Sequence, residues 1–156
     1  LRDSKFNQCD LSLCNFNKAD LFGITINACK AQGCNFDSAN FTNVVSRNFV
    51  FSMANMTNTD FSYSDFTNVF LEKCDLSGSR LNSVILNNAN LEEADLTNTQ
   101  FSPCQYEGLS IYKADFRNAE ISQVDIRKLD FSGVRILDWQ QAFFMESLGV
   151  LVSGDG

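Results

Sequence analysis

A period of five residues runs through the sequence and limits what the chain can fold into. Every fifth residue from Leu1 to Ile136 gives 28 positions, here called centres, and 26 of them are Leu, Ile, Phe, Met or Tyr. Two residues before the centres, 23 of 27 positions are Ala, Cys, Ser, Thr or Val. This pattern fits neither the 3.6-residue period of a helix nor the two-residue period of a strand. An internal repeat therefore decides the fold class.

Glycine and proline mark where the repeat turns. Two residues after a centre lie five glycines and the one proline, namely Gly23, Gly33, Gly78, Gly108, Gly133 and Pro103. Corners belong at such residues. If each unit makes one short extended side and one corner, four units close a coil of about 20 residues, and coils stack at about 4.8 Å. The centre and the small residue point into the lumen. The repeat thus predicts an all-β solenoid over residues 1–136.

The cysteines and the missing catalytic residues bear on chemistry. All six cysteines occupy the small inward position: Cys9, Cys14, Cys29, Cys34, Cys74 and Cys104. This placement predicts core thiols rather than disulfides or metal ligands, and free thiols suit a reducing cytoplasm. Histidine is absent, and no glycine-rich phosphate loop occurs. We therefore expect no enzyme, no cofactor and no metal site.

The chain is acidic, with 12 basic and 19 acidic side chains. Such a charge disfavours direct nucleic acid binding and suits a basic protein partner, although it also serves to keep a rod soluble. Asp75, Asp95 and Asp115 recur at the length of one coil, which predicts one vertical column, with Glu92 and Glu93 near it. The column is either a solvated edge or a line of negative potential. No apolar run is long enough to span a bilayer.

The repeat first breaks in NVVSRNFVFSMAN, residues 43–55. Ser46 occupies a centre and Phe49 a position meant for a small residue. We expect residues 44–53 to leave the coil as a loop that offers a partner-binding surface. The alternative is a deformed coil in which Phe49 fills the lumen. The loop residues concerned are Ser46, Arg47, Asn48, Phe49, Val50 and Phe51.

The repeat breaks again after Ile136. Asp138 with Gln141 has capping-box spacing, and Gly149 can end a short α-helix within the segment 137–156. Apolar residues cover too much of this helix for one buried stripe. We expect them to close the end of the last coil and to form a two-fold dimer, with residues 150–152 as an added strand. The predicted interface comprises Trp139, Phe143, Phe144, Met145, Leu148 and Val150.

The repeat resembles the pentapeptide repeat family over residues 1–136, which implies a right-handed quadrilateral β-helix. A closer resemblance lies in CKAQGCNF at 29–36, LEKCDL at 71–76, DIRKLDFSGVRI at 125–136, and WQQ with MESLGVLV near the end. These segments are similar to Qnr-type quinolone-resistance proteins. Further N-terminal coils and a first loop, normal in that subfamily, are not in these residues.

The Qnr resemblance implies a function. It implies a non-enzymatic, rod-shaped homodimer that binds DNA gyrase and topoisomerase IV, mimics duplex DNA and protects these enzymes from quinolones. The segment 44–53 matches the second projecting loop of the subfamily, whose F-[CS]-x-A ending is here FSMA at 51–54. The alternative is a pentapeptide repeat scaffold for a different protein partner.

Overall fold

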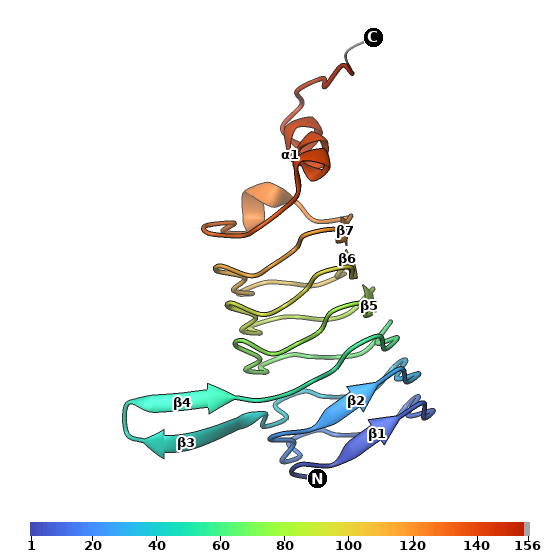
Figure 1. The fold of residues 1–156 in the computed structure, drawn as a ribbon, viewed down its shortest axis with the longest axis vertical. Helices are drawn as coiled ribbons and strands as arrows, with labels where there is room; N and C mark the ends of the chain where they lie inside the picture. The colour runs from blue at the N-terminus through green and yellow to red at the C-terminus, as the bar shows by residue number, and fades with distance from the viewer. Residues whose placement is uncertain (155–156) are drawn as a thin grey trace.

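The computed structural model describes residues 1–154, and its coils stack along one axis from the N-terminus to a C-terminal helix (Figure 1). Parallel bridges join each coil to the next, over most of the rod between residues four units apart. On one side the bridges run from the first coil to the last. The seven rungs of this column are Lys5, Thr25, Asn55, Asp75, Asp95, Asp115 and Arg135. Four five-residue units therefore make one coil of a β-helix-type fold.

Most sides are too short to count as strands. The strands are β1 (Lys5–Asn7), β2 (Thr25–Asn27), β3 (Thr42–Ser46), β4 (Phe49–Ser52), β5 (Arg80–Asn82), β6 (Gln100–Ser102) and β7 (Glu120–Ile121). β1 pairs with β2, and β5, β6 and β7 form a three-stranded sheet, all in parallel. β3 and β4 are antiparallel. The helical segments are η1 (Ile126–Lys128), η2 (Asp138–Gln140) and α1 (Gln141–Ser147).

Most corners are left-handed whether or not glycine occupies them. Within residues 1–154, seventeen non-glycine residues have a positive φ, and all of them lie two residues after a centre, as do five glycines. At Gly78, with φ of 70°, an added Cβ would collide with Asn58 Oδ1 of the coil below. The corners therefore stack closely, and the corner conformation is imposed by closing the coil rather than by glycine alone.

The lumen is filled by the centres and the small residues, as the period predicts. Phe16, Phe36 and Phe66 stack face to face in consecutive coils, with ring centroids 5.0 and 4.7 Å apart. All six cysteines are free, and the Cys9 N–H donates to Cys29 Sγ at 3.4 Å across one coil. Stacked thiols thus serve as packing.

Cys104 is exposed, so its predicted inward position is wrong. The cause is Pro103, which occupies a corner position but cannot adopt a positive φ. Ser102 and Pro103 are instead buried, and the following side chain turns outward. Proline therefore marks the position of the corner correctly in the sequence, but it alters the backbone of that unit and turns the small residue outward.

Gln140 closes the open end of the last coil. Its side chain is buried; Oε1 accepts hydrogen bonds from the N–H groups of Leu137 (2.7 Å) and Asn118 (3.1 Å). Its Nε2 donates to the carbonyls of Phe116 (2.8 Å) and Ala119 (2.9 Å). Of these four groups, the Asn118 N–H and the Ala119 carbonyl are the ones whose equivalents in lower coils bond to the next coil. The Gln140 side chain thus takes the place of two ladder partners at the end of the rod.

The C-terminal helix differs from its prediction in two details. Leu137, not Asp138, occupies the N-cap position of η2, and Gln140 rather than Gln141 makes the reciprocal bond to the cap backbone. Gly149 has φ of 83° just after α1. Residues 150–152 form no strand within residues 1–154, because no neighbouring backbone lies beside them in a single chain.

Candidate interaction surfaces

The hairpin of β3 and β4 is the one element that projects sideways from the coils of residues 1–154 (Figure 1). Before the hairpin, Asp20 bridges Asn40, which lies four repeat units further along the chain. Across the hairpin, Lys30 bridges Asp60, which lies six units further along. The hairpin is therefore an insertion of two whole units, so the five-residue phase passes through it unchanged.

The hairpin exposes apolar side chains to solvent. The register pairs Val44 with Val50 and Ser46 with Phe49, with a bulge between Val44 and Ser46. Phe49 is 58% exposed, so it does not fill the lumen. Arg47 and Asn48 form the turn and are also exposed. The predicted loop residues are thus together on one projection, with apolar strands and a cationic tip.

Phe51 differs from the other predicted loop residues because it packs against the rod. Its ring meets Phe22 edge to face at 5.3 Å. At the base, the Gly23 N–H donates to the Met53 carbonyl at 2.7 Å, and Ser52 Oγ donates to the Glu72 carbonyl. The sequence prediction misses Phe22, although it is an aromatic residue at a position that is otherwise usually polar.

The structure brings Asp75, Asp95 and Asp115 together in one column of bridges. Each carboxylate accepts a hydrogen bond from the backbone N–H two residues later, at 2.9 to 3.1 Å. These aspartates therefore stabilise their own turns. This role explains the preference for Asp or Asn before each centre.

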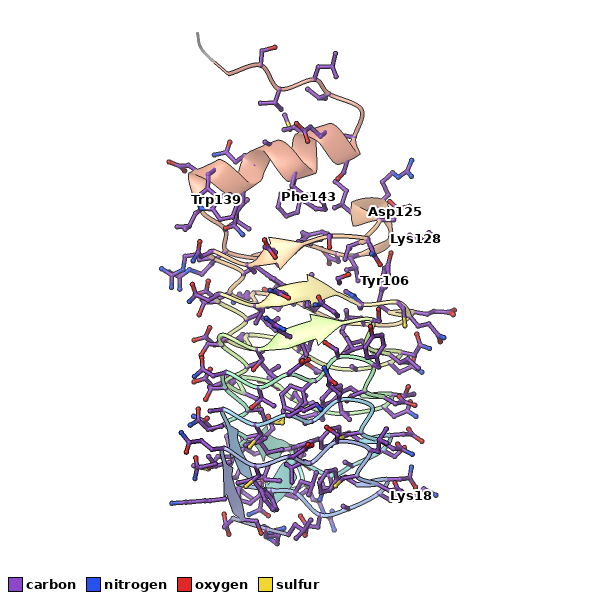
Figure 2. The ribbon with its side chains drawn as sticks, turned by 90° about the vertical axis from the view of Figure 1, so that its right-hand side faces the viewer. Lys18, Tyr106, Asp125, Lys128, Trp139 and Phe143 are labelled. Atoms are coloured by element: carbon purple, nitrogen blue, oxygen red, sulfur yellow. The ribbon has the colours of Figure 1, made fainter. Side chains whose placement is uncertain are left out.

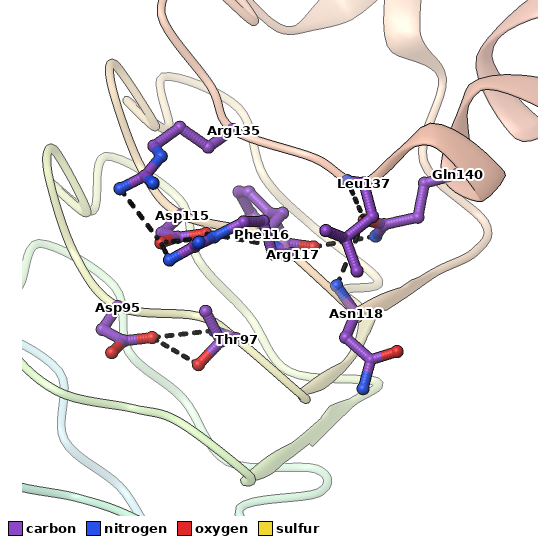
Figure 3. A network of polar contacts seen from close by, with 9 residues as sticks. All are labelled: Asp95, Thr97, Asp115, Phe116, Arg117, Asn118, Arg135, Leu137 and Gln140. Atoms are coloured by element: carbon purple, nitrogen blue, oxygen red, sulfur yellow. Dashed lines mark hydrogen bonds and ion pairs between the residues drawn. The ribbon is translucent and has the colours of Figure 1, made fainter.

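Two arginines converge on the upper end of the column (Figure 3). Arg117 Nη2 lies 2.7 Å from Asp115 Oδ2, and Arg135 Nη1 lies 3.5 Å from it. The hydrogen bonds from Arg117, together with the charge of both arginines, hold the pKa of Asp115 below its ordinary value. The two arginines therefore neutralise the charge of Asp115, and this residue contributes little to a line of negative potential.

Glu92 and Glu93 lie on a neighbouring edge. Glu92 accepts a hydrogen bond from Ser110 Oγ at 2.7 Å, whereas Glu93 is exposed at a corner with φ of 55°. Residues 51–110 hold 8 acidic and 2 basic side chains, a net charge of −6 out of −7. The acidity is thus concentrated in the middle of the rod.

The C-terminal segment presents apolar side chains above the final coil (Figure 2). Trp139 is 59% exposed, and Met145, Leu148 and Val150 are also exposed. Phe143 and Phe144 are half-buried, and Phe144 packs edge to face on Phe131 at 5.2 Å. A groove of about 510 Å³ between β7 and α1 is lined by Trp139, Phe143 and Phe144, among others. One face of the segment therefore closes the rod and the other faces solvent.

Residues 1–154 contain no cluster of three or more Cys, Asp and Glu side chains placed to hold a metal ion. Within the same residues, no helix has the length and apolarity needed to cross a membrane.

The repeat and the coil geometry agree with one protein family. Residues 54–140 match the model of the family described as "Pentapeptide repeat region". Residues 1–23 match the model described as "Pentapeptide repeats (8 copies)". The chain belongs to the pentapeptide repeat family.

Within this family the chain is of the Qnr type. It is 42% identical over 80 residues to pentapeptide repeat protein QnrB4 of Escherichia coli, which covers 51% of this chain and 37% of that protein. It is 36% identical over 142 residues to pentapeptide repeat protein VPA0095 of Vibrio parahaemolyticus, covering 91% of this chain and 66% of that protein. The chain thus matches little more than a third of the length of QnrB4.

The similarity to this family extends to the three-dimensional structure. Trypsin-treated QnrB1, a plasmid-mediated fluoroquinolone resistance protein, superposes with a TM-score of 0.88 at 35% identity, covering 96% of this chain and 70% of that one. Full-length QnrB1 gives a TM-score of 0.70 at 31% identity, covering 93% and 68%.

Proposed function

We propose that this protein is a non-enzymatic, DNA-mimicking partner of DNA gyrase and topoisomerase IV that protects them from quinolones. The proposal rests on its Qnr type and on the description of QnrB1 as a fluoroquinolone resistance protein. The observation that carries it in this chain is the β3–β4 hairpin, whose exposed Val44, Phe49 and Val50 project from a polar rod. Exposed apolar groups on a rigid support are typical of protein interaction sites.

The charge of the rod supports a basic partner. The central coils carry most of the net charge, and opposite charge steers association and raises its rate. Because Asp115 is paired with Arg117, we assign the negative potential to exposed groups such as Glu93 and Glu107 rather than to Asp115. Binding to the basic DNA site of a topoisomerase should therefore weaken as salt rises.

The proposal includes a right-handed quadrilateral coil, a cytoplasmic location and a C-terminal homodimer. Trp139, Leu148 and Val150 are apolar and uncovered in one chain, and a two-fold contact would cover the same patch on both copies. A dimer would place a hairpin on each half of a longer rod. Each half would then meet an equivalent site on a two-fold symmetric enzyme.

A supercoiling assay with gyrase and a fluoroquinolone tests the function. The intact protein should restore supercoiling. A variant lacking residues 43–52 should not, although this deletion removes two whole units, restores the one-coil spacing between Thr25 and Asn55 and so keeps the coil in register. Phe49→Ser should lose most of the rescue. Tyr63→Ser is its matched control, because Tyr63 is also an exposed aromatic residue but lies on a corner away from the hairpin.

The outcomes separate the parts of the proposal. Failure of the intact protein to restore both supercoiling by gyrase and decatenation by topoisomerase IV would refute the topoisomerase target and favour a scaffold for another partner. Equal rescue by the intact protein and the deletion variant would remove the hairpin from the mechanism.

Light scattering tests the dimer. Trp139→Asp combined with Leu148→Asp should give a monomer, because both side chains are exposed and their replacement leaves the lumen intact. Leu13→Asp, at an exposed corner near the other end, should remain dimeric. A dimeric mass for the double variant would exclude this interface.

A further inference from the structure

Phe22 lies on the outside of the coil and is nevertheless buried. The position just after each centre is polar from Arg2 to Ser132 with two exceptions, Phe22 and Tyr112. Tyr112 is 42% exposed, as expected for an outward side chain, whereas Phe22 is only 9% exposed. A large apolar ring on the outer surface is therefore covered by something other than the lumen.

Two side chains from distant parts of the sequence cover this ring. Phe51 of the hairpin approaches edge to face, at 85° and 5.3 Å between centroids. On the N-terminal side, the Arg2 guanidinium lies 4.8 Å from the Phe22 centroid, and Arg2 is also paired with Asp20 at 3.0 Å. Phe22 is thus held between the first coil and the hairpin.

The contact continues toward the hairpin tip. Phe51 and Phe49 lie 6.0 Å apart on β4. Arg2, Phe22, Phe51 and Phe49 therefore form one row, here called the aromatic row, which runs from the N-terminal coil into the projecting element. In residues 1–154, the Phe22–Phe51 pair is the aromatic contact that joins the hairpin to the coils.

A hairpin of two strands is marginally stable by itself and needs packing to hold one conformation. The hydrogen bonds from the Gly23 N–H to the Met53 carbonyl and from Ser52 Oγ to the Glu72 carbonyl hold the base of the hairpin. A contact displaced from that base adds a constraint on the direction in which the strands project. The Phe22 ring supplies it, because an edge-to-face pair depends on orientation as well as distance.

We propose that Phe22 is a positioning residue that fixes the direction in which the β3–β4 hairpin projects, with Arg2 holding its ring in place. The contact itself is independent of the partner. Its consequence for gyrase or topoisomerase IV rests on the proposed function, because a hairpin already held in its binding geometry loses less conformational freedom on binding.

Trypsin tests the positioning without any partner. Arg47 is the one basic residue between Lys30 and Lys73, so cleavage inside the hairpin occurs at a single known bond. Cleavage of a local site requires the strands to open, and its rate follows the population of the open form. Phe22→Ser should be cut at Arg47 about five to ten times faster than the unaltered protein. Tyr112→Ser, which removes an outward aromatic ring at the equivalent position, should be cut at the unaltered rate.

Further variants keep the test decisive if Phe22→Ser folds poorly. Phe22→Tyr retains the ring and should restore slow cleavage. Phe51→Ala should accelerate cleavage to a similar extent, and combining it with Phe22→Ser should add little, because both remove the same contact. Slow cleavage of folded Phe22→Ser and of Phe51→Ala, or full additivity of the two, would overturn the proposal.

The supercoiling assay supplies a readout that a merely structural role would not change. Phe22→Ser should lose rescue while its dimeric mass and its thermal unfolding midpoint stay close to those of the Tyr112→Ser control. Rescue equal to that of the control, together with fast cleavage at Arg47, would show that the direction of the hairpin does not matter for protection and would overturn the functional half of the proposal. If the unaltered protein gives no rescue, the proposed function fails, while the trypsin comparison still decides the positioning role.

Discussion

Replacing Gln140 by Ala should open the C-terminal end of the rod. The substitution removes four hydrogen bonds, made at 2.7 to 3.1 Å by a side chain that is only 4% exposed. At about 0.5–1.5 kcal/mol each, their loss amounts to about 2–6 kcal/mol. Water can replace part of these bonds at a solenoid end, so we expect about 2–4 kcal/mol in the free energy of unfolding of the last coil.

The assay for this loss is urea unfolding combined with amide hydrogen exchange. Because each coil contacts only its neighbours, exchange should rise first at Asn118 and Leu137 rather than along the whole rod. Gln141→Ala, at an exposed neighbouring position, should stay within about 0.5 kcal/mol of the unaltered protein. Gln140→Glu can still accept from two N–H groups but cannot donate to two carbonyls at neutral pH, so it should be nearly as damaging as Ala. A Gln140→Ala loss no larger than that of Gln141→Ala would refute the capping role.

Three further predictions concern charge, thiols and corners. The pKa of Asp115 is held below its ordinary value of 3.8, chiefly by Arg117, so the stability from this carboxylate is complete above that value and is lost as the pH falls through the lowered pKa. In urea unfolding between neutral pH and about pH 2, Asp115→Asn should lose less stability on acidification than the unaltered protein, and an equal loss would contradict this assignment. Burial raises the pKa of Cys34 to about 11, so its thiol should react with a disulfide reagent only on unfolding, whereas exposed Cys104 should react at once. Cys104→Ser should remove one equivalent from that fast phase, beside any reaction of the half-buried Cys9 and Cys14, and an unchanged fast phase would count against the outward placement. Gly78→Ala should cost about 1 kcal/mol by thermal or urea unfolding because its φ is positive, and an unchanged stability would show that the corner accepts Ala without strain.

The coil can be predicted from sequence because lumen packing and corner geometry both act within each five-residue unit. Leu81, Phe101 and Ile121 pair in parallel, as their one-coil spacing requires. The two arginines that neutralise Asp115 are also visible in the sequence, since Arg117 follows in the same turn and Arg135 occupies the next rung of the column. The sequence prediction of the Asp column misses these counter-charges, although the positions of both arginines in the repeat mark them.

Other features depend on contacts that no local pattern carries. The sequence predicts the hairpin only as a loop, because the pairing of Val44 with Val50 lacks a glycine turn to mark it. The closing role of Gln140 requires the backbone of the preceding coil. The cover over Phe22 likewise arises from Phe51, which belongs to the hairpin and lies far from Phe22 in the sequence. These features follow from how the coils close rather than from the repeat itself.

The most direct test of the proposed protection is the amount of DNA that gyrase leaves cleaved in the presence of a fluoroquinolone. Titrating the intact protein should lower the drug-stabilised cleavage complex progressively, and the effect should weaken at higher salt and with the variant lacking residues 43–52. A cleavage complex that stays constant while the added protein is folded and dimeric would contradict the proposal.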